Sequence, residues 1–501
     1  GYFSHKGEII SIKRDKITGK GGVLTQVPFF WANSGFGELR NTESAGNYDF
    51  GKSNPDATIL KHDTNMFDTF YLLGNSPKNI LAKYYMLTGK PLMPPKYALG
   101  LGHVGNFLTT LWQPGKAKER NAVMFEDGNY YTRTNKPEDA SGKGSLNGEE
   151  EYQFSARAMV DRYQKQHFKL SWIVPNYDVQ EINEEAMASF SEYAAIHDVS
   201  AGLWSQNNTP KASPDTTFIQ TDTTDPKVLK NDALILRNNL KRKRPLIFSN
   251  TGIAGSQNRT MLAFGDIGGN WENIPTQVAG FLGASLSGQP LVGSAVDGTA
   301  GGGNAQIAIR DFEWKAFTPI LFNLDDQGKF SKTPFAYNSK MTQINRAYLK
   351  LREQLQTYLY TLIYRAQVGE PILRPLFLEF PHEQVNYTPQ VGHEFMLGPN
   401  LLISPIVNGR EDGNGNSRKD NLYLPNHRTM WVDLFDGKKY LGGRVYNKQS
   451  YPSWHLPVFV RGGAIFDLGE RNYVLYPQGK SKMVTYDDNG YNDYSRNHVA
   501  T

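Results

Sequence analysis

Apolar residues along this chain follow two alternating spacings. From about residue 96 to residue 368, short apolar runs typical of buried strands alternate with longer segments in which apolar residues recur every three or four positions, as at 182–197 and 348–368. Strands that alternate with helices form parallel sheets, and eight of them close into a barrel. The pattern therefore predicts an α/β fold, a (β/α)8 TIM barrel. Its predicted strands are residues 97–101, 169–174, 200–204, 217–221, 245–248, 260–264, 290–293 and 319–322.

The two ends of the chain show short alternating runs of apolar and polar residues between Gly, Asn and Pro clusters, which indicates antiparallel strands. Because the chain starts at Gly1 within such a region, we expect a fragment or a processed protein, with an incomplete first domain. The predicted organisation is an N-terminal β-sandwich at 1–90, the catalytic barrel at 91–384 with an excursion near 113–148, a proximal C-terminal antiparallel β-domain at 385–475 and the start of a distal β-domain at 476–501.

Composition removes several classes of function. The 501 residues contain no cysteine, which excludes disulfides, thiol catalysis and cysteine-ligated metals. No apolar stretch approaches the roughly 20 residues of a membrane span. The net charge of +5 is spread over 54 basic and 49 acidic residues, and the densest basic run, 241–244, is read as a solvated helix end rather than a nucleic-acid patch. We expect no membrane or nucleic-acid partner, and we favour an extracellular over a cytoplasmic location.

Two aspartates stand directly after predicted strands. Asp222 follows the run 217–221 and Asp266 follows 260–264, and turn-forming residues come after each. Catalytic groups of parallel barrels lie at the carboxyl ends of strands, and two carboxylates on one rim can divide nucleophile and acid/base roles. The alternative interpretation is that both are ordinary strand-end or helix-capping aspartates.

Four blocks of sequence resemble glycoside hydrolase family 31, the family of retaining α-glucosidases and their relatives. The block Arg244-Pro-Leu-Ile-Phe-Ser-Asn-Thr-Gly-Ile-Ala-Gly-Ser-Gln257, followed by Gly265-Asp-Ile-Gly-Gly-Asn-Trp271, is similar to the family's strand-five and acid/base segments. The other blocks are residues 88–100, 355–381, and 395–407 with 456–463. The resemblance implies that Asp222 is the nucleophile and Asp266 the general acid/base. Asp225-Pro226 stands where many members have Glu-Pro.

Departures from the family pattern bear on the substrate. Ser249-Asn250 replaces a usual Arg-Ser pair, Ala295 replaces a usual Asp, and 323–328 replaces a usual Asn-His. Together with 286–294 and 309–319, they resemble a divergent bacterial subgroup that includes cycloalternan-degrading and 1,3-α-isomaltosidase enzymes. The resemblance implies an oligosaccharide substrate with α-1,3 or α-1,6 linkages, hydrolysed or transglycosylated. An α-N-acetylgalactosaminidase and a non-catalytic carbohydrate-binding homologue remain the alternatives.

Further candidates for contact with the sugar lie near the predicted rim. Asp178 is weighed against a turn-stabilising role, Trp271 against core packing, and Arg310 against an internal ion pair. The glycine-rich run 299–304 is expected to line the pocket or to form a plain flexible loop, and Gly100-Leu-Gly-His-Val-Gly105 is interpreted as a turn at the rim rather than a dinucleotide site. No cofactor or metal is expected. The full set of predicted substrate-binding residues is Asp178, Asn250, Trp271, Asp297, Arg310 and Asp325.

Overall fold

The described residues form two compact units. The barrel unit comprises Leu92–Asn270 and Val292–Leu349, and the flanking unit comprises Gly1–Pro91, Trp271–Leu291 and Lys350–Thr501. The computed structural model describes residues 5–12, 27–42, 44–119, 121–206, 216–221, 223, 225–240, 244–250, 252–264, 268–325, 330–467, 473–476 and 484–486.

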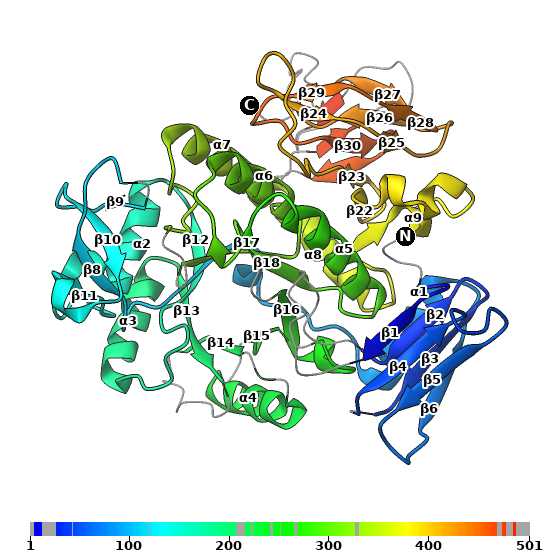
Figure 1. Ribbon diagram of the computed structural model, residues 1–501, viewed down its shortest axis with the longest axis horizontal. Coiled ribbons are helices and arrows are strands. Elements are labelled where there is room, and N and C mark those ends of the chain that lie inside the picture. Colours follow the sequence, from blue (N-terminus) through cyan, green and yellow to red (C-terminus); the bar gives the residue numbers. More distant parts are fainter. Residues whose placement is uncertain are drawn as a thin grey trace. The chain divides into compact units, whose positions relative to one another are not determined.

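The barrel unit is built on a closed sheet in which every pair of neighbouring strands is parallel (Figure 1). The predicted (β/α)8 barrel is confirmed. Around the barrel the strands are β7(Leu101–Gly105), β12(Leu170–Val174), β13(Ser200–Ser205), β14(Phe218–Thr221), β15(Ile247–Ser249), β16(Thr260–Phe264), β18(Val292–Ala295) and β20(Ile320–Asp325).

The predicted position of the first strand is wrong. Residues Lys96–Leu99 form a 3₁₀ helix, and the strand is the glycine-rich run Leu101–Gly105, which the sequence suggested was a turn. Its glycines serve packing inside the barrel. A Cβ at Gly102 would lie closer than 3.0 Å to three ring atoms of Trp172, a contact that real side chains do not make. Glycine here admits a buried indole rather than a nucleotide.

Helices follow most barrel strands, and several of them begin with a capping side chain. Ser155, Asn183, Asp225 and Asn304 each accept a backbone N–H of the first helical turn, which satisfies donors that have no partner within the helix. The single helix predicted at 348–368 is two helices that meet at Leu355. The helices are α2(Ala156–Lys165), α3(Glu184–Ile196), α4(Pro226–Asn239), α5(Asn273–Leu286), α6(Ala305–Lys315), α7(Ser339–Gln354) and α8(Gln356–Ala366), with α5, α8 and the end of α7 from Lys350 in the flanking unit.

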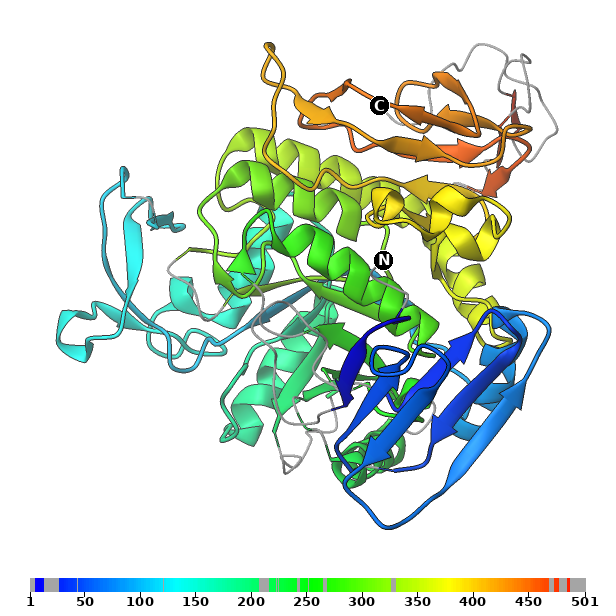
Figure 2. The same ribbon diagram turned by 45° about the vertical axis from the view of Figure 1, so that its right-hand side comes forward.

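The excursion near 113–148 forms a four-stranded antiparallel sheet, drawn in cyan beside the barrel strands of its unit (Figure 2). Trp112, Phe125 and Phe154 form its small core, and the rings of Trp112 and Phe154 stack at 5.7 Å. The sheet order is β11(Gly142–Lys143), β8(Leu111–Pro114), β10(Tyr130–Thr134) and β9(Val123–Met124).

The flanking unit begins with two three-stranded antiparallel sheets followed by helix α1(Pro77–Thr88). Ile80, Leu81 and Tyr84 of that helix pack with Phe29, Leu39 and Leu72 of one sheet. The strands are β1(Ile9–Ile12), β4(Gly46–Phe50) and β5(Thr58–His62) in one sheet, and β2(Phe29–Ala32), β3(Phe36–Arg40) and β6(Thr69–Leu73) in the other.

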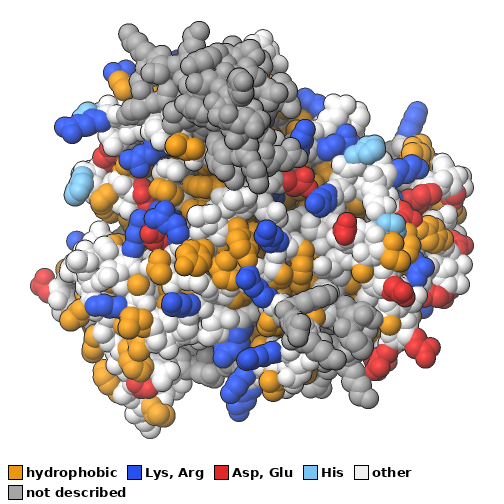
Figure 3. Space-filling view, turned by 180° about the vertical axis from the view of Figure 1, so that it is seen from behind, with side chains coloured by type: hydrophobic (Ala, Val, Ile, Leu, Met, Phe, Trp, Pro, Cys, Tyr) orange, Lys and Arg blue, Asp and Glu red, His pale blue; other side chains and the backbone are white. Residues whose placement is uncertain are grey.

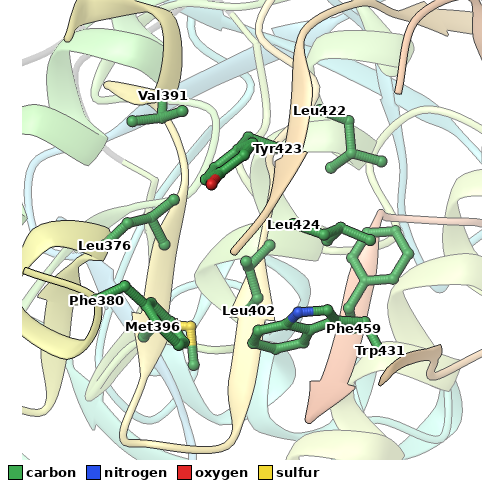
Figure 4. Close-up of a cluster of buried hydrophobic side chains, with 10 residues drawn as sticks. All are labelled: Leu376, Phe380, Val391, Met396, Leu402, Leu422, Tyr423, Leu424, Trp431 and Phe459. Carbon is green, nitrogen blue, oxygen red and sulfur yellow. The ribbon is translucent and has the colours of Figure 1, made fainter. Parts of the chain in front are cut away.

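The C-terminal part of the flanking unit is an antiparallel β-domain whose core centres on Trp431 and Phe459 (Figure 4). Its largest sheet runs β21(Leu373–Pro375), β22(Phe395–Leu397), β23(Leu401–Ile403), β30(Val458–Arg461), β26(Met430–Asp433), β27(Lys439–Leu441). Smaller pairs are β24(Ser417–Lys419) with β29(Gln449–Tyr451) and β25(Leu422–Leu424) with β28(Arg444–Tyr446), and β31(Ile465–Asp467), β32(Tyr473–Leu475) and β33(Val484–Tyr486) form a separate sheet. Among the described residues, no helix has the length and apolar character needed to cross a membrane.

Candidate active site at the barrel rim

The two aspartates predicted to carry the chemistry, Asp222 and Asp266, lie outside the described residues. The strands that lead to them are described. Asp222 follows Thr221, the last residue of β14, and Asp266 comes two residues after Phe264, the last residue of β16. Strand β15 lies between β14 and β16 and pairs in parallel with both. The carboxyl-terminal ends of β14 and β16 therefore lie on the same rim of the barrel.

The segment after β14 is tied down by local hydrogen bonds. Thr221 Oγ1 accepts the N–H of Thr223, and Thr223 Oγ1 accepts the N–H of Asp225, both at 3.2 Å. Asp225 Oδ1 then accepts the N–H of Lys227 at 2.8 Å and caps helix α4. Asp225, which stands where relatives of the resembled family have a glutamate, is exposed and serves this helix.

Asp297, predicted as a sugar contact, is buried after strand β18. Its Oδ2 accepts hydrogen bonds from Lys332 Nζ at 2.9 Å and from the Tyr337 hydroxyl at 2.7 Å. Lys332 is 2% exposed and Asp297 3%. Burial raises the pKa of Asp297 above its ordinary value, and this effect prevails over the opposing influence of Lys332 and Tyr337. Sequence reasoning found Asp297 but missed both partners, which lie in a polar segment without periodicity.

The glycine-rich run after Asp297 contains a short paired strand rather than being a plain loop throughout. Strand β19(Ala300–Gly301) pairs in parallel with β17(Gly268–Gly269), which begins two residues after Asp266. The N–H of Gly303 donates to the Tyr337 hydroxyl at 2.7 Å, and Asn304 caps helix α6. The run connects Asp297 to the segment that carries the predicted acid/base.

Helix α6, which follows the glycine-rich run, carries buried charged side chains. Arg310 lies in the middle of the helix, fully buried, with its Nη1 2.8 Å from Glu313 Oε2. Asp311 Oδ2 accepts from Lys315 Nζ at 2.6 Å and from the backbone N–H of Asp297 at 2.7 Å. Burial lowers the pKa of Lys315, and Asp311 opposes that shift. The internal ion pair that the sequence left open for Arg310 is present, and this burial favours a supporting role for its guanidinium.

Asp325, the last residue of β20, is paired with the excursion sheet. Its Oδ1 lies 2.5 Å from Arg133 Nη2, and the side chains are 4% and 14% exposed. Burial acts to raise the pKa of Asp325, but Arg133 and the nearby His103 more than offset it, so the pKa is lowered. Lys332 also donates its backbone N–H to Asp325 Oδ1 at 3.1 Å. Arg133 could not be singled out from the sequence, because it stands alone in a polar stretch.

His103 lies in strand β7, on the opposite face of the strand from Gly102, and is fully buried. Its Nδ1 lies 3.0 Å from the Tyr163 hydroxyl, and its Nε2 has no hydrogen-bond partner in the described part of the chain. Burial lowers its pKa to about 4, an effect that Asp325 opposes and Arg133 and Arg162 reinforce. The imidazole is therefore neutral at physiological pH.

Asn250 and Asp178 follow barrel strands β15 and β12, and neither is fully buried. Asn250 is half-buried directly after β15, and Asp178 is exposed in the turn after β12 with a left-handed φ of 61°. The turn is held by Asn176 rather than Asp178. Asn176 Nδ2 donates to Val179 O at 2.8 Å and Trp204 O at 3.1 Å, and its Oδ1 accepts from Trp204 N at 2.9 Å. Sequence reasoning did not single out Asn176.

Trp271 belongs to the flanking unit, where it is half-buried before helix α5. Its indole lies against Gly409, since a Cβ there would be 2.8 Å from Trp271 Nε1. This contact favours the packing role that the sequence left open, and sugar contact by Trp271 stays a prediction.

Three potential metal ligands come together elsewhere in the flanking unit. The ligand atoms of Asp433, Asp436 and His455 lie within 4.8 Å of one another. His455 Nε2 is 3.0 Å from both Asp433 carboxylate oxygens, and Asp433 Oδ1 also accepts the backbone N–H of Phe435 at 2.9 Å. These contacts describe a stabilised turn after β26, and we assign no ion to it.

Basic side chains do not gather into a single patch on the face shown in Figure 3, where Lys and Arg lie scattered among apolar and neutral groups. In the run 241–244 only Arg244 is among the described residues, and it is exposed. This distribution gives no support to a nucleic-acid surface on that face.

Comparison with protein families identifies the chain. The profile of the "Glycosyl hydrolases family 31 TIM-barrel domain" matches residues 229–362, and that of the "Glycosyl hydrolase family 31 C-terminal domain" matches residues 369–466. The chain belongs to glycosyl hydrolase family 31. Asp266 lies within the first match, and Asp222 precedes it by seven residues.

Curated relatives extend well beyond this chain. "Alpha-glucosidase 2" of Bacillus thermoamyloliquefaciens is 31% identical over 265 residues, which are 50% of the chain and 32% of that protein. A "Probable glucan 1,3-alpha-glucosidase" of Oryza sativa subsp. japonica is 24% identical over 513 residues, covering 88% of the chain and 54% of the rice protein. The chain thus spans between a third and about half of these relatives.

Solved structures share the fold. The cycloalternan-forming enzyme of Listeria monocytogenes superposes with a TM-score of 0.72 at 15% identity, covering 97% of this chain and 56% of that one. The family 31 dextranase of Flavobacterium johnsoniae, complexed with isomaltotriose, gives 0.71 at 18% identity and covers 95% and 66%.

Proposed function

We propose that this chain carries the catalytic centre of a retaining α-glycosidase, with Asp222 as the nucleophile and Asp266 as the general acid/base. The observation that supports the proposal is the carboxyl-terminal rim formed by β14 and β16: in sequence, Asp222 comes immediately after β14 and Asp266 comes two residues after β16. Barrel enzymes place their chemistry at that rim.

The reaction is a double displacement. The Asp222 carboxylate attacks the anomeric carbon while Asp266 donates its proton to the departing glycosidic oxygen, which leaves a covalent glycosyl–enzyme ester. Asp266, now a carboxylate, takes a proton from water as the water oxygen attacks the same carbon and releases Asp222. Two inversions retain the α configuration. A sugar hydroxyl in place of water gives transglycosylation. Retaining enzymes hold the two carboxyl groups about 5–5.5 Å apart.

The substrate we propose is an α-linked gluco-oligosaccharide with α-1,3 or α-1,6 bonds. Support comes from the rice relative named for glucan 1,3-α-glucosidase and from two fold neighbours, a dextranase complexed with isomaltotriose and a cycloalternan-forming enzyme. Asn250 and Asp178 are the residues we expect to reach the sugar, since Asn250 is only half-buried and Asp178 is exposed. Asp297, Arg310 and Asp325 are buried in ion pairs, which favours a role in holding the rim.

The test uses Asp222→Asn beside Asp225→Asn, a matched change three residues away at the exposed cap of α4. Both proteins are assayed on isomaltose, nigerose, cycloalternan, p-nitrophenyl α-glucoside and p-nitrophenyl α-N-acetylgalactosaminide. We expect Asp222→Asn to lower kcat/KM by roughly a thousandfold or more on every substrate that the wild type cleaves. Asp225→Asn keeps its capping oxygen and is expected to stay near the wild type.

The outcomes separate the alternatives. NMR of the first sugar released from the wild type should show the α anomer. Binding of isomaltose without turnover of any substrate would instead identify a non-catalytic carbohydrate-binding protein. Turnover restricted to the N-acetylgalactosaminide would replace the substrate class while keeping the mechanism. Unchanged activity of Asp222→Asn would remove the nucleophile assignment.

A further inference from the structure

A buried triad of Asp297, Lys332 and Tyr337 lies next to the segment that follows Asp266. We propose that this triad is a positioning device for the acid/base: it fixes the glycine-rich run 300–303, which pairs with Gly268–Gly269 and so sets the path of the chain that leads away from Asp266. The inference rests on the proposed function, because it assigns a role relative to the acid/base of that reaction.

Several hydrogen bonds hold the side chains of the triad together. Lys332 Nζ donates both to Asp297 Oδ2 at 2.9 Å and to the carbonyl oxygen of the same residue at 2.7 Å, and the Tyr337 hydroxyl donates to Oδ2 at 2.7 Å. Asp297 has a left-handed φ of 59°, a conformation that aspartate adopts more readily than most residues other than glycine. Its backbone N–H is also held, by Asp311 Oδ2 at 2.7 Å. Side chain and backbone of Asp297 are therefore both fixed.

The triad holds the glycine-rich run above it. Tyr337 accepts the N–H of Gly303 at 2.7 Å through the same hydroxyl that donates to Asp297. Gly302 covers the three polar groups so closely that a Cβ there would lie 2.9 Å from Asp297 Oδ2 and closer still to Lys332 Nζ. Gly302 also has a φ of 100°, which excludes other residues without strain. Loss of the triad would remove the contacts that Tyr337, Asp297 and Lys332 make with Gly302 and Gly303.

The glycine-rich run in turn holds β17. Gly268 pairs with Ala300 and Gly269 with Gly301. Gly269 also rests directly on Asp297: a Cβ at Gly269 would lie 2.5 Å from the Asp297 carbonyl oxygen and closer still to Oδ1. Asp297 Oδ1 has no hydrogen-bond partner in the described part of the chain. It lies against the backbone of Gly269 in β17. A path of fixed contacts thus runs from Lys332 to a residue two positions beyond Asp266.

A misplaced general acid has a distinctive kinetic consequence. Proton donation matters greatly when the leaving group is a sugar alkoxide and hardly at all when it is fluoride, which departs without a proton. An acid displaced by about 1 Å loses about a hundredfold in rate on the first kind of substrate. A general loss of folded enzyme, by contrast, lowers the rates on both substrates by the same factor.

The experiment compares kcat/KM for isomaltose with kcat/KM for α-glucosyl fluoride in the full chain. The variants are Lys332→Met and Tyr337→Phe, with Asp266→Asn as the reference for a lost acid. Lys419→Met and Tyr423→Phe are matched controls in the flanking unit: Lys419 is a buried lysine bonded to Pro405 O at 2.8 Å, and Tyr423 donates to Glu383 at 2.9 Å. We expect Lys332→Met to lose at least tenfold more on isomaltose than on the fluoride, and Tyr337→Phe a smaller loss of the same kind. The controls should keep the wild-type ratio.

Equal losses on both substrates in Lys332→Met and Tyr337→Phe, with Asp266→Asn still discriminating, would overturn the inference and leave the proposed function standing. Failure of the wild type on both substrates, or no discrimination by Asp266→Asn, would count against the proposed function instead. If Lys332→Met does not fold, Tyr337→Phe alone tests the inference, because this variant keeps the aromatic ring and the Lys332–Asp297 ion pair. A wild-type ratio in folded Tyr337→Phe then overturns the inference.

Discussion

Arg133, in strand β10 of the excursion sheet, is joined to Asp325 at the end of barrel strand β20 by an ion pair of 2.5 Å, although 192 residues separate them in sequence. Arg133 also lies over the ring of Trp112, 5.4 Å from its centroid, so the guanidinium connects the core of the excursion with the barrel rim. A small irregular sheet of this kind has little core of its own, and the buried pair fixes it against the barrel.

Replacing Arg133 by Met is expected to destabilise the barrel unit by about 3 kcal/mol or more, because Asp325 keeps a buried charge without its partner. The pKa of Asp325 is lowered in the folded protein, so its stabilising contribution is present above the pKa of the unfolded chain and is lost as the pH falls through the folded value. The difference between wild type and variant should therefore be large at pH 7 and shrink in acid. Urea unfolding at several pH values measures it.

A control for this change lies in the same excursion. Lys136 pairs with Asp139 at 3.9 Å, but both side chains are exposed, so Lys136→Met should change stability by less than about 0.5 kcal/mol. Adding Asp325→Asn to Arg133→Met should recover part of the loss, since it removes the buried charge. A difference between Arg133→Met and wild type that stays constant with pH would show that lost packing on Trp112, not the ion pair, accounts for the effect.

Much of the barrel was predictable because its strands are buried on both faces and appear as short apolar runs between turn formers, as in 260–264, which the structure reproduces as β16. The first strand was misplaced because two of its five residues, Gly102 and Gly105, are glycines. Gly102 carries no apolar side chain, and the space it leaves is filled by Trp172, a residue of the next strand. The hydrophobic pattern of one segment does not show that a side chain from another segment will pack against its glycine.

Gly102 therefore gives a sharp prediction. Gly102→Ala places a methyl group closer than 3.0 Å to the ring of Trp172 inside a closed barrel, and we expect a loss of roughly 1–3 kcal/mol or more through overpacking. The matched control is Gly283→Ala in helix α5, where a Cβ would meet nothing within 4 Å and alanine is the better helix former. That change should be neutral or stabilising by up to about 1 kcal/mol. Thermal unfolding of both variants tests the pair; an unchanged melting temperature for Gly102→Ala would contradict the packing described.

His103 should make the barrel unit acid-sensitive. The unfolded chain protonates this imidazole below its ordinary pKa of 6.5, whereas burial keeps the folded form neutral down to about pH 4. Between these values the unfolded state binds more protons, so stability falls as the pH falls. From pH 7 to pH 5 the contribution is roughly 2 kcal/mol.

The variant His103→Asn keeps a group within reach of the Tyr163 hydroxyl but cannot be protonated. It will be less stable than wild type at pH 7 because it leaves a cavity. Its stability should nevertheless decline less steeply between pH 7 and pH 5 than that of the wild type. Parallel declines of the two proteins in denaturant unfolding would show that His103 is not the group that titrates.

The candidate site, like the fold, contains residues that the sequence could predict and residues that it could not. Asp222, Asp266 and Asp297 could be picked out because each follows a strand end, a position that a single segment reveals. Lys332 and Tyr337 could not, because they lie in a polar stretch after β20 and acquire their roles only when the barrel closes and brings them to Asp297. Asn176 and Asp178 show why sequence alone could not assign these roles. Both are polar residues of one turn, yet Asn176 is buried and Asp178 is exposed.

Asn176 and Asp178 provide the last prediction, since they separate structure from sugar contact within one turn. Asn176 is fully buried and makes three hydrogen bonds, two of them as a donor to carbonyl oxygens at 2.8 and 3.1 Å. Asn176→Asp cannot donate and sets a charge against those oxygens, so we expect a loss of about 3 kcal/mol or more in unfolding free energy.

Asp178→Asn has the same size and tolerates the left-handed backbone, so its melting temperature should match the wild type. If Asp178 binds a sugar hydroxyl, as we expect, its loss of charge raises KM for isomaltose by about ten- to a hundredfold with little change in stability. The two variants thus move different observables. An Asp178→Asn enzyme with wild-type KM would remove this residue from the sugar site, and an Asn176→Asp protein of wild-type stability would contradict the hydrogen bonds that join β12 to β13.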